Sequence, residues 1–329
     1  MTHIALLGCG RIGQVHARAI ARTPGARLVA VADAMAPAAE AIARQYGAEP
    51  RSIEAIETAG DIDAVVICTP TDTHAELIER FARAGKAIFC EKPVDLSQAR
   101  VRACLDVVQE TGARLMIGFN RRFDPHFMAL KAAIDAGKIG AVEQVTITSR
   151  DPGLPPAAYI KVSGGIFRDM TIHDFDMARH LLGEEIASVY ATATALVDPS
   201  IRDLGDYDTA TVVLTTASGR QATILNSRRA SYGYDQRVEV HGSLGMITVK
   251  NQRAADIELA TTAGFQKPPL LDFFMTRYGA AYEAELGAFL DALREGGAMS
   301  PSGEDGLAAL ELAEAALASV ETGAAVRLA

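Results

Sequence analysis

Side chains that could transfer a proton occur in two separate stretches of the chain. Lys92 lies two residues after an apolar run that predicts a strand, and a lysine at a strand end can hold and polarise a substrate oxygen. Asp169, His173 and Asp176 are spaced by four and then three residues, which predicts that they share one face of a helix. Taken alone, these three residues favour an ordinary solvated helix face over a proton-transfer site.

A glycine-rich turn predicts a dinucleotide site. The segment Gly8-Cys9-Gly10-Arg11-Ile12-Gly13 follows the first predicted strand and opens the first predicted helix. Gly8, Gly10 and Gly13 permit a tight turn there and let the backbone approach a pyrophosphate at the helix N-terminus. Asp33 ends the second predicted strand and is expected to accept hydrogen bonds from ribose hydroxyls. Because uncharged residues follow Asp33, we expect NAD rather than NADP.

Two further segments lie at strand ends, where open α/β sheets bind ligands. Thr69, Pro70 and His74 follow the third predicted strand, and Glu91 and Lys92 follow the fourth. These residues are therefore candidates for contacting the cofactor together with the glycine turn. The alternative for the first segment is a capped helix start, with His74 on the helix surface.

The first 119 residues alternate apolar runs with amphipathic stretches, which is typical of βαβ units and a parallel sheet. We therefore predict an α/β protein whose residues 1–119 form an NAD-binding Rossmann domain with a doubly wound parallel sheet. The predicted strands are 4–7, 28–32, 64–68, 87–90 and 115–119, and the predicted helices are 12–22, 38–46, 73–84 and 96–110.

Residues 120–329 are expected to form an α+β domain with a large, mostly antiparallel sheet that binds substrate and mediates oligomerisation. Apolar residues on both faces of a strand, such as Val212, Val213 and Leu214, suggest a covered outer sheet face. Predicted strands are 142–149, 188–197, 209–216, 221–226, 238–241 and 246–250, and predicted helices are 125–136, 167–182, 280–294 and 304–322.

Composition narrows the functional class. The 329 residues include 32 Lys and Arg against 41 Asp and Glu, a formal charge of −9, which disfavours nucleic acid as a partner. Four dispersed cysteines (Cys9, Cys68, Cys90 and Cys104) with no zinc spacing favour reduced thiols, a cytoplasmic location and no metal site. No apolar run is long enough for a membrane span.

The sequence resembles the Gfo/Idh/MocA family of nicotinamide-dependent oxidoreductases, and among its members the inositol dehydrogenases. The resemblance rests on the Glu91-Lys92-Pro93 motif and on the segment from Gly164 to Asp176, and similar stretches extend over nearly the whole chain. It implies that Lys92 is the active-site lysine, that His173 takes a proton and that Asp169 orients His173.

The same resemblance implies a small polyol substrate, most simply myo-inositol oxidised with NAD to scyllo-inosose. The implied substrate-binding residues are Lys92, Asn120, Arg121, Asp151, Asp169, His173, Asp176, Tyr234 and Tyr282. Ser149 and Asp151 depart from the His and Asn that some inositol dehydrogenases carry, which bears on the identity of the polyol. A homotetramer is also implied.

Two alternatives stay open from the sequence. One is a scyllo-inositol or aldose dehydrogenase of the same family. The other is a non-catalytic, NAD-binding regulatory protein, since folds are reused without their chemistry; such a protein has no need to keep Lys92, Asp169 and His173 together.

Overall fold

The computed structural model describes residues 1–328 and divides into two compact units. The first unit contains Met1–Asp124 and Gly279–Leu310. The second contains Pro125–Tyr278 and the chain from Glu311 onward. Among the described residues, no helix is long and apolar enough to cross a membrane.

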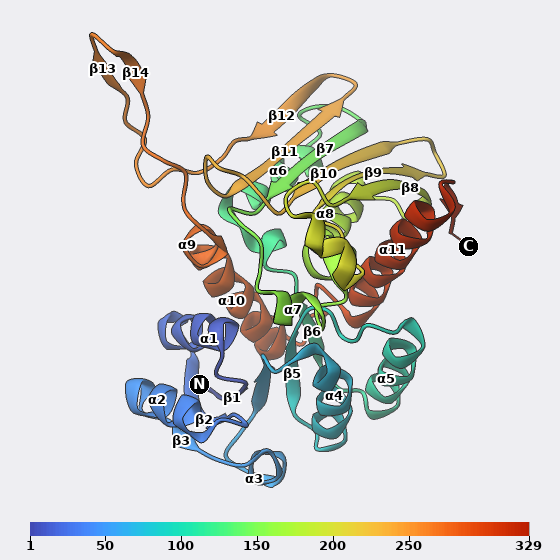
Figure 1. Ribbon diagram of the computed structural model, residues 1–329. Helices are drawn as coiled ribbons and strands as arrows, with labels where there is room; N and C mark the ends of the chain where they lie inside the picture. Colours follow the sequence, from blue (N-terminus) through green and yellow to red (C-terminus); the bar gives the residue numbers. More distant parts are fainter. Residues whose placement is uncertain (329) are drawn as a thin grey trace. The chain divides into compact units, whose positions relative to one another are not determined.

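The first unit is built on a parallel sheet in the order β3-β2-β1-β4-β5-β6 (Figure 1). The prediction of a doubly wound parallel sheet is confirmed, and its central strands are buried because helices cover both faces. The strands are β1 (Thr2–Leu7), β2 (Ala26–Ala32), β3 (Glu49–Pro50), β4 (Ala64–Ile67), β5 (Ala87–Glu91) and β6 (Leu115–Gly118). The two-residue strand β3 is too short to show a period in the sequence.

The helices between these strands match the sequence prediction to within a few residues. The exception is α3, a single short helix that the sequence analysis left out. The helical segments are α1 (Arg11–Arg22), α2 (Ala36–Tyr46), α3 (Ile53–Thr58), α4 (His74–Arg83) and α5 (Gln98–Thr111), with 3-10 turns η1 (Thr71–Thr73) and η2 (Asn120–Phe123).

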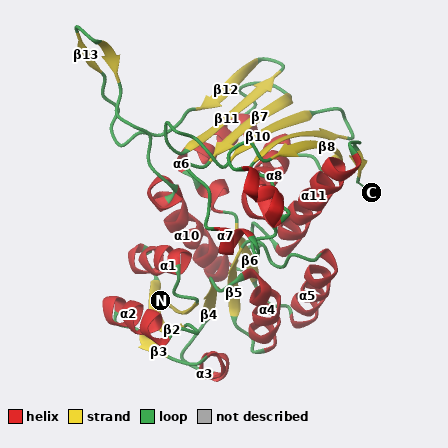
Figure 2. Cartoon of the chain, in the orientation of Figure 1, coloured by secondary structure: helices red, strands yellow, loops and turns green. Residues whose placement is uncertain are grey.

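The second unit contains a seven-stranded sheet in the order β12-β11-β7-β10-β9-β8-β15. Figure 2 shows the strands of this sheet in yellow. Only the β7–β10 pair is parallel, so the prediction of a mostly antiparallel sheet is confirmed. The strands are β7 (Val142–Arg150), β8 (Ile186–Thr194), β9 (Thr209–Thr216), β10 (Gln221–Ser227), β11 (Asp235–Gly242), β12 (Gly245–Val249) and β15 (Val326–Arg327).

Helix α8 packs on β7 and β10. A separate hairpin, β13 (Leu259–Thr261) with β14 (Gly264–Gln266), projects away from the sheet of this unit (Figure 1). The remaining helical segments of the unit are α6 (Pro125–Asp135), α7 (Ala157–Ile160), the π-helix η3 (Phe167–Thr171), α8 (Ile172–Leu182), the 3-10 helix η4 (Pro199–Leu204) and α9 (Phe274–Arg277).

The C-terminal helices change the predicted division at residue 119. Helix α10 (Gly279–Glu295) packs on α1 and η2, and its Phe289 ring lies 5.9 Å from the Phe89 ring of β5. Helix α11 (Gly303–Thr322) begins in the first unit and continues in the second. The first unit therefore includes a late segment of the chain, because the apolar face of α10 covers surface that the Rossmann helices leave open.

Candidate functional site

The three glycines of the first turn have different surroundings. Gly8 has φ +91° and a Cβ there would lie 2.4 Å from the carbonyl oxygen of Cys68, while a Cβ on Gly13 would lie 2.0 Å from that of Gly8. Both glycines are therefore required by the fold itself. A Cβ on Gly10 would meet no atom within 4 Å, so Gly10, the N-cap of α1, keeps open the space in front of the helix N-terminus. Arg11 is exposed and Ile12 half-buried in the first turn of the helix.

The carboxylate of Asp33 is fixed against this turn. Its Oδ2 accepts a hydrogen bond from the Cys9 amide at 2.6 Å, and its Oδ1 accepts one from the Met35 amide at 2.7 Å. Each carboxylate oxygen can accept a further bond. The side chain is half-buried, and Ala34 beside it is exposed. The Asp33 carboxylate therefore lies at the end of β2, and the residues that directly follow it in the sequence carry no positive charge.

His74 lies inside the first unit rather than on the helix surface. Its side chain is 2% exposed. Nδ1 lies 2.8 Å from the carbonyl oxygen of Pro93, and Nε2 lies 2.8 Å from that of Thr69. The imidazole therefore ties the loop after β4 to the loop after β5, whereas Thr69 is half-buried and Pro70 exposed at the loop surface.

Two charged side chains at the carboxyl end of β5 have different surroundings. Glu91 is 7% exposed, and its Oε1 lies 2.7 Å from Nε2 of His16 in α1. Lys92 is half-buried at the carboxyl end of the sheet. Glu91 therefore joins α1 to β5 from inside the unit. Sequence reasoning missed His16, since nothing near it in sequence points to a partner 75 residues away.

The buried thiols of this unit behave as small apolar side chains. Burial raises the pKa of the Cys9 thiol to about 11, with Asp33 adding to the shift. Burial also raises the pKa of Cys68, Cys90 and Cys104. All four cysteines are free and buried, and among residues 1–328 no group of His, Cys, Asp or Glu is arranged to hold a metal ion.

Besides Lys92, three further predicted substrate residues lie in the first unit. Asn120 and Arg121 are 3% and 6% exposed in η2, at the carboxyl end of β6. Tyr282 is 6% exposed on α10, and its ring meets the ring of His16 edge-on at 5.4 Å. One face of Tyr282 is therefore used in packing within this unit.

In the second unit, the predicted helix over 167–182 begins as a π-helix. Asp169 lies in the π-helical η3, and His173 lies in the first turn of α8. Four residues are close to one turn in an α-helix and in a π-helix alike, so the shared face of these two residues stays a prediction. π-Helical turns often occur at functional sites. His173 is half-buried, and Asp176 is fully buried.

Each carboxylate oxygen of Asp169 contacts another side chain. Oδ1 accepts a hydrogen bond from the Tyr159 hydroxyl at 2.8 Å, and Oδ2 lies 3.3 Å from Nη1 of the buried Arg228. Sequence reasoning did not predict Arg228 as a site residue. A buried arginine needs a carboxylate partner, so the burial of Arg228 is a reason to look for the carboxylate that pairs with it.

Ser149 belongs to a buried hydrogen-bond network next to α8. Its hydroxyl donates to Oδ1 of Asp174 at 2.7 Å and lies 3.1 Å from Oε1 of Gln236. Asn226 donates to Oδ2 of Asp174 at 2.8 Å. Ser149 is 0% exposed. A serine in place of the histidine that some inositol dehydrogenases carry therefore changes the packing next to α8. Asp151, which follows β7, is half-buried and stays a predicted substrate residue.

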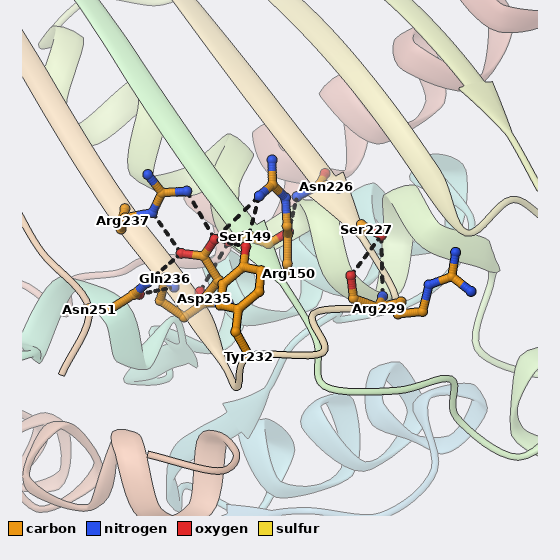
Figure 3. Close-up of polar contacts among 10 residues, drawn as sticks. All are labelled: Ser149, Arg150, Asn226, Ser227, Arg229, Tyr232, Asp235, Gln236, Arg237 and Asn251. Atoms are coloured by element: carbon orange, nitrogen blue, oxygen red, sulfur yellow. Dashed lines mark hydrogen bonds and ion pairs between the residues drawn. The ribbon is translucent and has the colours of Figure 1, made fainter. Parts of the chain in front are cut away.

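A cluster around Asp235 shapes the loop that carries Tyr234 (Figure 3). Burial tends to raise the pKa of Asp235, but hydrogen bonds from Arg237, Tyr232 and Asn251 outweigh it and lower that pKa. Tyr234 itself is 6% exposed and packs edge-on against Tyr278 and Phe273. The loop is therefore held by charge on one side and by aromatic rings on the other.

Family models match both parts of the chain. Residues 2–119 match the NAD-binding Rossmann fold of the oxidoreductase family, and residues 127–248 match the GFO/IDH/MocA C-terminal domain. The chain belongs to the Gfo/Idh/MocA family. It is therefore an NAD-dependent oxidoreductase, and the open space at Gly10 and the fixed carboxylate of Asp33 fit such a cofactor.

Similar members of this family cover the chain almost from end to end. It is 68% identical to the inositol 2-dehydrogenase of Rhizobium meliloti strain 1021, over 96% of each chain. It is 44% identical to a solved myo-inositol dehydrogenase from Corynebacterium glutamicum, with a TM-score of 0.97 and coverage of 100% and 99%. A scyllo-inositol dehydrogenase from Lactobacillus casei, solved with NAD(H) and scyllo-inositol, is 28% identical with a TM-score of 0.93 and covers 99% of each chain.

Proposed function

We propose that this protein oxidises myo-inositol to 2-keto-myo-inositol (scyllo-inosose) with NAD. The observation that carries the proposal is the 68% identity, over 96% of the chain, to a protein named inositol 2-dehydrogenase. The second unit supports it by presenting the half-buried Asp151, Asp169 and His173. Hydroxyl-rich rings are recognised by such fixed donors and acceptors.

In the proposed reaction each side chain has one task. When bound, NAD would supply the hydride acceptor for the carbon that bears the reacting hydroxyl. The Lys92 ammonium holds and polarises the hydroxyl oxygen, and the imidazole of His173 takes the hydroxyl proton as the carbonyl forms. The anionic carboxylate of Asp169 favours the protonated imidazole. Asn120, Arg121, Asp151, Asp176, Tyr234 and Tyr282 are proposed to contact the remaining hydroxyls.

The residues proposed to contribute to the cofactor site have different tasks. They are the glycine turn, Asp33, Thr69, Pro70 and Glu91. Gly10 and the first turn of α1, with Arg11 and Ile12, would contact the pyrophosphate, and Asp33 the adenosine ribose. Thr69 and Pro70 are accessible at the loop surface. The geometry supports an indirect contribution from Glu91 and His74, whose side chains hold neighbouring elements in place.

Activity with NAD is expected to exceed activity with NADP by at least tenfold in kcat/KM. A 2′-phosphate would meet the Asp33 carboxylate, and Ala34 offers no compensating charge. Initial rates with each cofactor, measured by absorbance of the reduced form, test this. Replacing Asp33 by Ser together with Ala34 by Arg should narrow the difference, and equal efficiency in the unmodified protein would contradict the assigned role of Asp33.

Among polyols, myo-inositol is expected to have the highest kcat/KM, with scyllo-inositol and glucose lower. The axial hydroxyl of myo-inositol leaves an equatorial C–H for transfer, whereas every hydroxyl of scyllo-inositol is equatorial. A buried hydrogen bond left unmade costs about 1–3 kcal/mol, which is enough to separate epimers. NADH formation across a polyol panel decides between them. A faster reaction with scyllo-inositol or an aldose would support the alternative dehydrogenases, and no reaction with any polyol would favour a non-catalytic NAD-binding protein.

A homotetramer assembled through the open face of the second unit's sheet is also proposed. Val212 and Leu214 are fully buried, while Val213 between them is half-buried on the other face beside the 42% exposed Tyr190. Threonines supply much of the rest of that face, so it is less apolar than the sequence suggested. Light scattering at micromolar concentration should give about four times the 34.8 kDa chain mass, and a monomer mass would overturn this proposal.

The proposed location is the cytoplasm. The four cysteines are unpaired thiols buried within the structure, which suits a reducing compartment.

A further inference from the structure

Arg228 is a buried cation in contact with Asp169, one of the proposed proton-transfer residues. It directly follows strand β10 and is 1% exposed. Its Nη1 lies 3.3 Å from Oδ2 of Asp169, and its Nη2 lies 3.6 Å from Oδ2 of Asp206. A guanidinium removed from water is strongly unfavourable unless carboxylates compensate it. The Asp169–Arg228–Asp206 triad provides this compensation with one cation between two carboxylates.

Asp206 is itself held in a defined place. Its Oδ1 accepts a hydrogen bond from the Ile166 amide at 2.8 Å. Gly165 has φ +84°, and a Cβ there would lie 2.9 Å from the same oxygen. Gly165 therefore gives Asp206 room to approach the backbone. Burial raises the pKa of Asp206, which makes the guanidinium of Arg228 its natural counter-charge.

Asp169 is consequently held from two sides. The Tyr159 hydroxyl donates to Oδ1, and Arg228 contacts Oδ2. Tyr159 is 44% exposed, whereas Arg228 is buried, so the rigid contact is the one to arginine. A planar guanidinium can orient two carboxylates at once, which the point charge of a lysine does less well.

We propose that Arg228, anchored by Asp206, is a positioning residue that sets the orientation and charge of Asp169 during alcohol oxidation. This rests on the proposed function, in which Asp169 acts on the proton-accepting imidazole of His173. Arg228 needs no contact with substrate or NAD for this task. Its removal should therefore lower kcat and leave the affinity for NAD and the KM for NAD near their original values.

The test compares Arg228→Lys, Arg228→Met and Asp206→Asn with the matched control Arg229→Met, which alters the exposed neighbouring arginine. The polyol that the unmodified enzyme oxidises fastest serves as substrate. We expect kcat to fall at least tenfold for Arg228→Met, less for Arg228→Lys and least for Asp206→Asn. NADH binding should stay near that of Arg229→Met, whereas the melting temperature of Arg228→Met should be lower, because removal of Arg228 leaves two carboxylates without their buried cation.

A double-mutant cycle isolates the action through Asp169. If Arg228 works through that carboxylate, Arg228→Met should lower kcat little further in an Asp169→Asn background. A full additional loss there would overturn the proposal, as would original kcat in a folded Arg228→Met variant. Should Arg228→Met fail to fold, Arg228→Lys decides, since an unchanged kcat with lysine contradicts the need for a planar guanidinium. Absence of turnover with every polyol in the unmodified protein would instead refute the proposed function.

Discussion

Replacing His173 by Gln is expected to lower kcat for polyol oxidation by about 10²–10⁴, the usual contribution of a general base. Glutamine retains a similar size and polarity but cannot accept the hydroxyl proton at neutral pH. In the unmodified enzyme, kcat/KM should rise with pH as the imidazole becomes neutral and then level off, with an apparent pKa that belongs to the coupled groups. The variant should lose this dependence.

His180→Gln provides the matched control, because His180 lies in the last turn of the same helix α8. NADH fluorescence separates loss of chemistry from loss of cofactor binding. Asp169→Asn and Lys92→Ala should also lower kcat while NADH still binds, since they remove the anion beside the base and the cation at the alcohol oxygen. Near-normal turnover of His173→Gln with an unchanged pH profile would assign the proton transfer to another group, with Lys92 the next candidate.

Alanine substitutions in the glycine turn are expected to separate folding from cofactor binding. In Gly13→Ala the new Cβ would lie 2.0 Å from the backbone oxygen of Gly8, so the turn between β1 and α1 must move. Overpacking costs about 1–3 kcal/mol even where side chains can adjust, and backbone adjusts less easily. We expect a lower melting temperature and a Kd for NAD that is at least tenfold higher.

Gly10→Ala is the matched substitution, since its Cβ would meet no protein atom within 4 Å. Its melting temperature without cofactor should equal that of the unmodified protein, whereas its Kd for NAD should rise at least tenfold because the methyl group occupies the space in front of the helix N-terminus. Displacement of NADH by NAD, followed by the NADH emission, reports the Kd for NAD. An unchanged Kd in Gly10→Ala would show that the pyrophosphate does not approach this position, and an unchanged melting temperature in Gly13→Ala would contradict the close contact with Gly8.

The sequence alone determined the architecture of the first unit and the mostly antiparallel sheet of the second. Both depend on local patterns, namely buried strands followed by amphipathic helices, and alternating strands joined by short turns. The glycine turn and Asp33 were also predictable, because their positions follow from one strand, one turn and the next strand. The structure holds Asp33 at the turn as expected, with its carboxylate bound to the Cys9 amide.

Only the tertiary structure decided which partners the remaining polar side chains have. His74 lies inside between two loop carbonyls, Glu91 contacts His16 across 75 residues, and Asp169 contacts Arg228 across 59. Periodicity in the sequence likewise does not predict the π-helical start of the second-unit helix. It also does not predict that α10 belongs to the first unit. The physical reason is that secondary structure follows from near neighbours in sequence, whereas the partner of a buried charge is set by which distant segment the fold brings within hydrogen-bond distance.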